Sequence, residues 1–576
     1  MSSLGGLYIG VSGLNVSQAA LNITSHNMAN VDTKGFVRQQ AVLTDFGYVK
    51  LGESYMSSMQ QGLGANFATV KQVRDSFLDL AYRKETGRQA FYESQYQSVQ
   101  EVEGLFGELE GVSFQKSMND YWTSLQELVK EPDSIVARAS LIQTAVSFLE
   151  RADNISSQLK DYQINLNTNI ENQVNRINEI GDQVKSLNLK IRQYESTGKE
   201  KANDLRDQRN LLLDELSKMV NITYKENSNG IVDVNVEGVP FVTEDTAFKM
   251  ATVRVEDDSQ MLKPVWPAHG NADVFNLDRA PSSLNNNDIG SLKGLLVSRG
   301  NRQANYTDIP DKANYESDLE YDRAVREYNN QIDSSLIMTV QAQFDQLIHG
   351  IVTSVNDILS PNKEVTLADG SKIKILDEEK APVGMDADQT MGEALFNRKS
   401  VDRYSEPQLI EIVNSDGTHD VMMARIYQEE DPEDNYSLFT LGEIEVNKKI
   451  LQNSSVIPLS SKTGSGDFDV ETASKLIKNW QEPFATLSPN TLTLNNYTDY
   501  YSSMIGELAN RGEQMNNISA NQQSMVVSID NQRMQVTGVS SDEELVNLIK
   551  YQHAYNASAR YVNVVSQMLE DIVTKL

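Results

Sequence analysis

The side chains that most often carry out chemistry in proteins are sparse in this sequence. It contains five histidines and no cysteine. The histidines are scattered along the chain, at His26, His269, His349, His419 and His553. No two of them have the spacing of helical metal ligands, and the pattern His-Glu-x-x-His is absent, so a zinc enzyme is not predicted. The lack of cysteine excludes disulfide bridges, thiolate metal sites and cysteine nucleophiles.

Carboxylates, by contrast, are abundant. The chain has 81 acidic residues against 51 lysines and arginines, a formal net charge of −30. A phosphate backbone repels such a chain, and no run of basic residues forms a local patch, so no nucleic-acid partner is expected. The densest acidic cluster, residues 429–434, could bind a cation weakly, but a solvated loop is the favoured interpretation. The segment DADQTMGE, which starts at Asp386, lacks the ligand spacing of a calcium loop.

No motif for nucleotide binding or for a serine nucleophile occurs in the sequence. A pair of carboxylates for glycoside chemistry stays open as an alternative, because two acidic residues can meet from anywhere in a fold. The sequence therefore predicts no catalytic residue, no cofactor and no metal ligand, and it favours a protein that is not an enzyme.

The two ends of the chain show the most regular pattern. Near the N-terminus, apolar residues recur every three or four positions, which is heptad spacing. They are Leu4, Leu7, Val11, Leu14, Leu21 and Met28, and Gln18 and Ser25 occupy the remaining positions of the seam. Glycines at positions 5, 6, 10 and 13 each cost a helix about 1 kcal/mol. We therefore expect this segment to be helical only when it is packed.

The C-terminal segment has the same spacing. Its apolar seam consists of Leu545, Leu548, Tyr555, Ala559, Val562 and Leu569. Ser541 and Glu544 form a capping-box pattern at the start of this helix. The two ends could form an ordinary internal hairpin, or they could pair and assemble with neighbouring subunits. The second interpretation is favoured because residues 1–31 carry no Lys, Arg, Asp or Glu, which is unusual for a surface helix.

The patterns between the ends predict a multidomain α+β protein with an elongated shape and both termini at one end. Residues 1–40 and 541–576 are expected to form a terminal α-helical coiled coil. Residues 41–220, 286–360 and 441–540 are expected to form a mainly helical, bundle-like stem, and the alternating patterns in 221–285 and 361–440 predict β-rich outer domains inserted in the middle. No apolar stretch is long enough to insert into a membrane, and the N-terminus lacks the basic region of a cleaved signal peptide.

The ends also carry recognisable motifs. The segment SGLNVSQAALNITSHNMANVDTKGFVRQ resembles the N-terminal signature of bacterial flagellar rod, hook and hook-associated proteins. The family's turn motif matches Asn27, Ala29, Asn30, Thr33, Gly35 and Phe36. Gln552, Ala554 and Tyr555 match its C-terminal helix. Lys34 stands where many relatives have proline.

Three further features point, within this family, to a protein of the junction between hook and filament. They are Arg38-Gln39 after the turn, the string NDLRDQR within residues 202–222, and the segment GSLKGLLVSR at 290–299. The resemblance covers the ends and the stem. The β-rich parts match nothing recognisable.

The resemblance implies a structural adapter that assembles axially with copies of itself and joins the hook to the filament. The implied partners are the flagellar hook protein, the second hook–filament junction protein, and a cytoplasmic export chaperone at the C-terminal helix. The implied location is extracellular, on the flagellum, after export without a cleaved signal peptide. Two alternatives remain: a hook or distal-rod subunit of the same family, or a surface adhesin or enzyme domain carried in residues 221–440.

Overall fold

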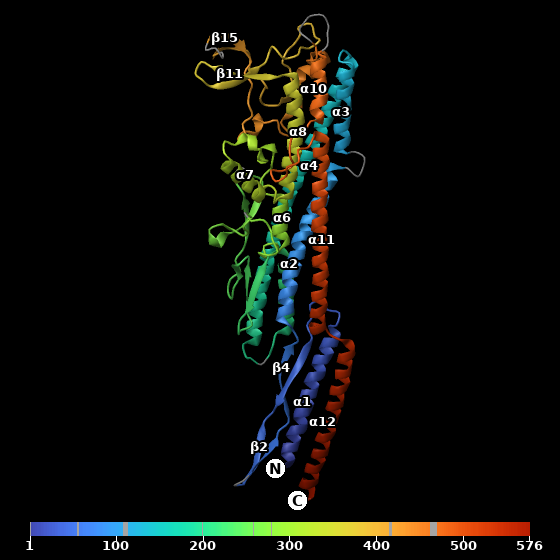
Figure 1. Cartoon of the computed structure of the whole chain (residues 1–576). Coiled ribbons are helices and arrows are strands. Elements are labelled where there is room, and N and C mark those ends of the chain that lie inside the picture. Colours follow the sequence, from blue (N-terminus) through green and yellow to red (C-terminus); the bar gives the residue numbers. More distant parts are fainter. Residues whose placement is uncertain are drawn as a thin grey trace.

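The computed structural model describes residues 2–54, 57–107, 113–198, 200–256, 259–277, 279–413, 418–460 and 469–575. The molecule is a long rod, and both termini lie at its lower end (Figure 1). The chain runs up through the rod in helices, forms β-rich lobes at its side and top, and returns through α11 (Tyr497–Thr537) and α12 (Ser541–Lys575). This is the multidomain α+β fold that the sequence predicted.

Helices of 5 to 61 residues build the stem. They are α2 (Ser76–Phe106), α3 (Phe114–Lys130), α4 (Ile135–Glu195), α5 (Asn203–Met219), α6 (Ser291–Arg299), α7 (Asp318–Gln331), α8 (Leu336–Leu359), α9 (Lys448–Gln452), α10 (Val470–Gln481) and α11. Several begin at a residue whose side chain accepts a hydrogen bond from a free backbone N–H of the first turn, as Asp75, Ser113, Ser134 and Asn496 do. Pro132 separates α3 from α4, because proline cannot continue a helix.

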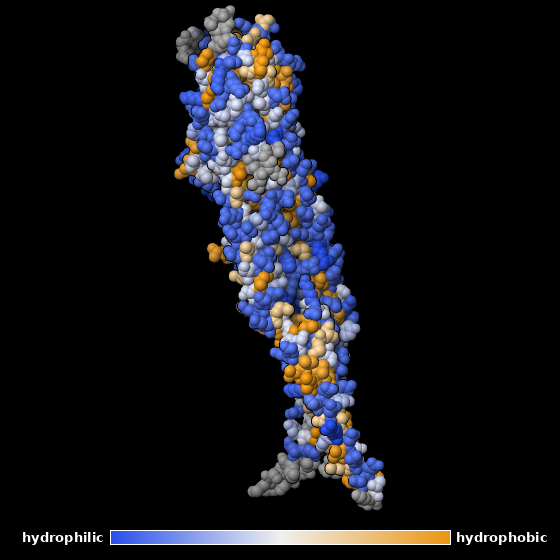
Figure 2. Space-filling view, turned by 90° about the vertical axis from the view of Figure 1, so that its right-hand side faces the viewer, coloured by the Kyte–Doolittle hydropathy of each residue, from blue (hydrophilic) through white to orange (hydrophobic). Residues whose placement is uncertain are grey.

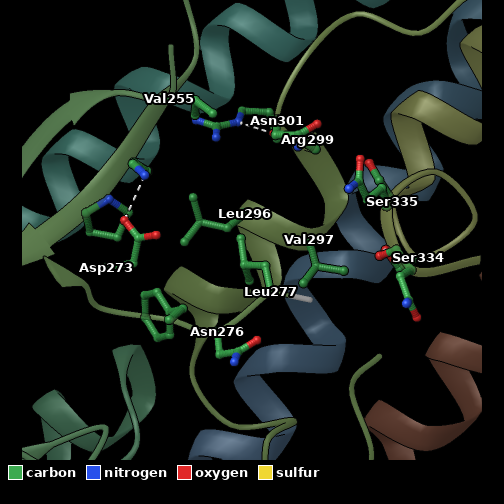
Figure 3. A pocket seen from close by; sticks show the side chains of 16 residues that line it. Val255, Asp273, Asn276, Leu277, Leu296, Val297, Arg299, Asn301, Ser334 and Ser335 are labelled. Atoms are coloured by element: carbon green, nitrogen blue, oxygen red, sulfur yellow. Dashed lines mark hydrogen bonds and ion pairs between the residues drawn. The ribbon is translucent and has the colours of Figure 1, made fainter. Parts of the chain in front are cut away.

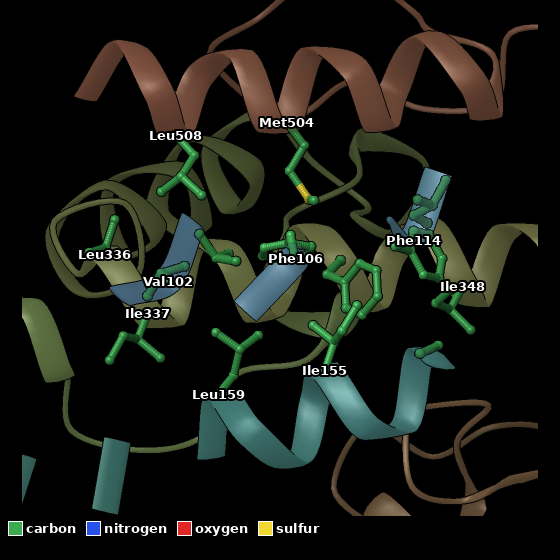
Figure 4. Packing of buried hydrophobic residues seen from close by; sticks show 14 of the residues in the cluster. Val102, Phe106, Phe114, Ile155, Leu159, Leu336, Ile337, Ile348, Met504 and Leu508 are labelled. Carbon is green, nitrogen blue, oxygen red and sulfur yellow. The ribbon is translucent and has the colours of Figure 1, made fainter. Parts of the chain in front are cut away.

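One apolar core runs along the stem. In its upper part, Phe106 of α2, Phe114 of α3 and Phe344 of α8 pack edge to face, with ring centroids 4.9–5.4 Å apart. Figure 4 shows Ile155 and Leu159 of α4 closing this core from one side and Met504 and Leu508 of α11 from the other. The core thus joins helices from both halves of the chain, which makes the stem one cooperative body.

The β-rich lobes are small antiparallel sheets. The first consists of β5 (Ile222–Glu226), β6 (Val232–Val236) and β7 (Val239–Val242), and the second of β8 (Ala251–Arg254), β9 (Leu262–Trp266) and β10 (Ala272–Asp273). Both pack on α4. The upper lobe holds a sheet in the order β12-β11-β14-β15, built from β11 (Asn362–Leu367), β12 (Lys372–Leu376), β14 (Gln408–Val413) and β15 (His419–Ala424), while β13 (Phe396–Arg398) pairs with β16 (Ile444–Val446).

The lower end of the rod is a separate unit of two helices and two strand pairs. Helix α1 (Ser2–Ala29) lies against α12, and beside α1 runs a ribbon made of β1 (Gln39–Asp45), β2 (Tyr48–Ser54), β3 (Ser57–Gly62) and β4 (Ala65–Gln72) (Figure 1). The sequence patterns assigned residues from 41 onward to the helical stem and did not predict these four strands. We call α1, α12 and this ribbon the terminal unit.

Candidate assembly interface

The contact between α1 and α12 is made by small residues. A Cβ atom placed on Gly10 would lie 2.6 Å from Cγ2 of Val562, and one on Gly13 would lie 2.6 Å from Oγ of Ser558. Further along α1, Ala20 and Thr24 are buried. The helices can approach this closely only because the glycines have no side chain. The glycines that lower the helix propensity of α1 are therefore also the residues that let it pack.

The predicted N-terminal seam lies beside this contact. Successive residues of an α-helix are turned by about 100°, so Leu7 lies to one side of Gly6 and Gly5 to the other. On the Gly5 side, Ser12 and Ile9 contact Gly64 of the ribbon. On the other side, Leu7, Leu14, Leu21 and Met28 are half-buried and Val11 is exposed. The side chain of Leu4 lies outside the described residues.

The predicted C-terminal seam overlaps the contact with α1 in part. Leu548, Tyr555, Ala559, Val562 and Leu569 are half-buried, whereas Leu545 is exposed. The face that meets α1 also includes Ser558 and Val565. Neither seam is fully covered within one chain, so their role in assembly stays a prediction.

A second set of apolar residues on α12 faces solvent. It consists of Leu545, Val546, Ile549, Val564, Met568, Ile572 and Val573, with exposed fractions from 45% to 76%. Figure 2 shows hydrophobic surface gathered over the lower third of the molecule, whereas the stem above it is mainly hydrophilic. Exposed apolar surface of this extent is typical of protein–protein contact sites.

The family turn motif connects the terminal unit to the stem. Helix α1 ends at Ala29. The side chain of Asn27 is buried and makes two hydrogen bonds with the backbone of Gln39. Its Nδ2 donates to the carbonyl oxygen at 2.8 Å, and its Oδ1 accepts from the N–H at 3.0 Å. Asn30 donates to the carbonyl of His26 and accepts a hydrogen bond from the hydroxyl of Thr33. Asn27 and Asn30 thus fix the path of the chain as it leaves the helix.

Gly35 and Phe36 bring this turn onto α5. Gly35 has a positive φ of 82°, and a Cβ atom there would lie 2.5 Å from Cγ of Leu211, so only glycine fits. The ring of Phe36 lies 5.4 Å from the ring of His26. The turn motif therefore contacts α5 at Leu211, two residues after the NDLRDQR string.

Asp207, in that string, is the buried acceptor of this contact. Its Oδ2 accepts from the backbone N–H of Val37 at 3.1 Å, and its Oδ1 accepts from Nε2 of Gln72 at 2.8 Å. Burial raises the pKa of Asp207 to about 7, although the two hydrogen bonds and Arg74 oppose the shift. Asp207 thus ties the entry and the exit of the ribbon to the stem.

Arg38 ties the turn to the start of α12. Its Nε donates to Oε1 of Glu544 at 2.9 Å, and its Nη1 lies 2.9 Å from Oε2 of Glu543. Its backbone N–H donates to the carbonyl oxygen of Thr537 at the end of α11. The motif strings pointed to Arg38 and contained Asp207, but the sequence did not indicate what Asp207 bonds to. Glu544 was predicted to form a capping box with Ser541; its carboxylate instead accepts hydrogen bonds from Asn27 and Arg38. For Glu544 the available signal is an acidic residue on the seam side of the helix, one turn before Leu548, whereas Asp207 lies on the polar side of α5 and carries no such signal.

The chemistry considered at the outset finds little support in the geometry. The described residues contain no group of three or more residues suited to hold a metal ion. In the acidic cluster, Glu430 bonds with Tyr306 and His349 and accepts from the N–H of Phe439, so this residue is part of the folded structure. No helix within the described ranges is long and apolar enough to cross a membrane.

A cavity of about 430 Å³ lies between β9, α6 and the segment before α8 (Figure 3). Its charged side chains are partnered by the protein: Lys263 pairs with Asp273 at 2.8 Å, and Arg299 donates to Asn167 and to the carbonyl oxygen of Leu262. The side-chain oxygen of Asn301, in the same lining, is buried without a hydrogen-bond partner. The contacts of Lys263 and Arg299 fix the β8–β10 sheet to α6 and α4. The cavity therefore has the features of a structural gap between packed elements.

Comparison with known proteins agrees with the resemblance of the ends. Residues 99–371 match the model of the flagellar hook-associated protein FlgK helical domain. Residues 7–36 match the flagella basal body rod protein family, and 529–575 match the flagellar basal body rod FlgEFG protein C-terminal family.

The similarity to curated proteins spans the chain. Flagellar hook-associated protein 1 of Bacillus subtilis is 26% identical, over 99% of this chain and 98% of that protein. Its namesakes in Salmonella typhimurium and Escherichia coli are 24% and 23% identical, each over 98% of both chains. The fold resembles that of the flagellar hook junction protein FlgK from Burkholderia pseudomallei, with a TM-score of 0.53 at 14% identity, covering 80% of this chain and all of that one. The chain belongs to the family of flagellar hook-associated protein 1.

Proposed function

We propose that this chain is a structural adapter that joins the hook of the bacterial flagellum to its filament by axial assembly of identical subunits. The observation that carries the proposal is the terminal unit: two paired helices at one end of a rod, with apolar faces left exposed. Covering such a face with a neighbouring copy stabilises the assembly by about 25 cal/mol for each Å² of apolar surface removed from water. Copies packed side by side would bury these faces and align their rods.

In this assembly the terminal helices would form the inner layer, the stem would surround them, and the β-rich lobes would face outward. The predicted seam of α1 would then contact one neighbouring copy through its Leu14 side. The exposed apolar residues of α12, which share only Leu545 with the predicted C-terminal seam, would contact another. The proposed partners are further copies of this chain, the hook protein and the second hook–filament junction protein.

Export to the flagellum would precede assembly. We propose an extracellular location at the junction, reached without cleavage of a signal peptide, and a cytoplasmic chaperone that covers α12 before export. The exposed apolar residues of α12 support a chaperone, because a helix with this surface would otherwise associate prematurely.

A hook or distal-rod subunit is the first alternative. The matches to rod-protein families are confined to the ends, while the match to the hook-associated helical domain covers the long middle. That distribution favours the junction. A catalytic or adhesive domain within 221–440 is the second alternative. The charged side chains of the cavity in this region pair within the protein, which does not favour it.

Electron microscopy of flagella that carry a tagged form of this protein tests the proposal. The tag is expected at the boundary between hook and filament, and deletion of the chain is expected to leave hooks without filaments. A tag along the whole hook, or within the rod, would contradict the junction assignment and support the first alternative. Turnover of a glycan or peptide by the full-length protein would support the second.

A further inference from the structure

A groove opens at the foot of the stem, between α4 and α5, just above the terminal unit. Its floor is apolar, formed by Leu187, Leu211 and Leu212. Its rim carries three exposed lysines, Lys34, Lys190 and Lys218. We call it the lysine groove.

The groove carries a net positive charge although the protein as a whole is strongly acidic. Its two carboxylates are already neutralised: Asp214 pairs with Arg83 at 2.7 Å and with Arg533 at 2.6 Å, and Glu215 pairs with Arg176 at 2.7 Å. Among the described residues, no carboxylate lies within ion-pair distance of the three rim lysines. A partner that fits must offer acidic groups next to apolar ones.

We propose that the lysine groove receives the start of α12 from a second copy of this chain. That segment has the required chemistry. It begins with the exposed acids Asp542 and Glu543 and continues with Leu545, Val546 and Ile549, which are 45% to 64% exposed. Among the described residues, Asp542 makes no ion pair. Asp542 would meet the lysines while the apolar residues cover the leucine floor; Glu543 beside it pairs with Arg38 of its own chain.

The positions of the two surfaces favour a contact between copies. Within one chain, Glu543 and Glu544 pair with Arg38, and among the described residues neither acid pairs with a lysine of the groove. Figure 1 shows the lower end of α4 (teal) and the start of α12 at similar heights on opposite sides of α2. Copies arranged around a common axis bring opposite sides of neighbours together, which generates a ring or a helix of head-to-tail contacts.

This inference rests on the proposed assembly and names one contact within it. Because the chain contains no cysteine, introduced thiols report on this contact alone. The test places Ser186→Cys in the groove and Val546→Cys on α12 of the same full-length chain, in cells that build flagella. Treatment with a short bis-maleimide is expected to give a ladder of linked copies.

Each single-cysteine variant is expected to give no ladder, because its thiols lie on surfaces that do not face one another. The contact is wrong if the double variant sits at the junction and gives no linked copies. If the protein is absent from the junction, with or without the cysteines, the proposed function fails instead.

Reversing charges in the groove gives a second test, which again measures the yield of linked copies. Lys190→Glu together with Lys218→Glu is expected to lower the yield of linked copies at least tenfold. Adding Asp542→Lys to that chain is expected to restore it, because a reversed groove then meets a reversed partner. The matched control is Lys160→Glu with Lys185→Glu, two lysines of α4 outside the groove, which should leave the yield unchanged. Equal losses in both pairs, or no rescue by Asp542→Lys, would overturn the proposal, and a different partner in the groove would then be indicated.

Discussion

Asn27 and Glu544 lie 517 residues apart in the chain and are joined by a hydrogen bond of 3.1 Å from Nδ2 to Oε2. Both side chains are buried, with exposed fractions of 1% and 2%. The bond links the last turn of α1 to the first turn of α12, at the level where the terminal unit meets the stem. The two ends of the chain are thus connected by a specific polar contact as well as by the packing of their small residues.

Replacing Asn27 with alanine is expected to weaken the attachment of α1. The change removes the two bonds with Gln39 and the bond to Glu544, and leaves buried groups without partners, at a cost of about 2–3 kcal/mol. Hydrogen exchange of the α1 and α12 amides measures the loss. Asn22→Ala, at an exposed position of the same helix, is the control and should leave exchange unchanged. Equal protection in both variants would contradict the role given to Asn27.

Replacing Gly10 with alanine tests the close approach of α1 and α12. Alanine favours a helix by about 1 kcal/mol, so an isolated helix would gain stability. Here the added Cβ would lie 2.6 Å from Val562, and the helices must separate. We expect faster exchange of both helices in Gly10→Ala.

The same measurement on Gly10→Ala with Val562→Ala is expected to show recovery, since the second change frees the space. Gly5→Ala serves as control, because its nearest neighbour is the flexible end of Gln61 at 3.4 Å. A Gly10→Ala protein as protected as the Gly5→Ala protein would show that the packing is looser than described.

Leu14→Asp is expected to block assembly while leaving the stem folded. Leu14 is half-buried on the flank of α1 that its own chain leaves open, so a charge there would have to be buried in the contact with a neighbour. Circular dichroism of the purified protein should stay unchanged, and electron microscopy should show hooks without filaments. Asn15→Asp, at the exposed neighbouring position, should grow filaments. Normal filaments on the Leu14→Asp protein would remove the seam assignment.

The attachment of the turn to α5 is expected to weaken as the pH rises. The folded pKa of Asp207, about 7, lies above the ordinary value near 3.9 for an unfolded aspartate. The folded state therefore holds a proton that the unfolded state releases, and the stability this provides is present in full below about pH 4. It is lost as the pH rises to 7, by about 2 kcal/mol between pH 5 and 7.

Urea unfolding followed by circular dichroism measures this effect as a shift in the urea concentration at the midpoint of unfolding. Asp207→Asn has no proton to release and should show a flatter dependence over the same range. A dependence of equal size in Asp207→Asn would assign the effect to another group.

The sequence determined the helical ends, the order of helical and β-rich segments, and the family. The reason is that heptad spacing, turn residues and short motifs are local patterns, which the chain carries whatever its tertiary contacts. The four strands within residues 39–72 were not predicted, because Gln, Ser and Gly interrupt the alternation of apolar and polar residues there. Those strands are held by pairing with each other and by contact with α1, as at Gly64 and Ser12.

Only the tertiary structure decided which face of each terminal helix meets the other. Heptad spacing identified the leucines of α1 as its contact surface, but the contact with α12 of the same chain uses Gly10 and Gly13, since the absence of side chains lets the backbones approach. The leucines remain at the flank. Likewise, nothing local in the sequence connects Asp207 with Val37 or Glu544 with Arg38. Buried polar pairs of this kind depend on how distant segments meet, and that is set by the packing of the whole chain.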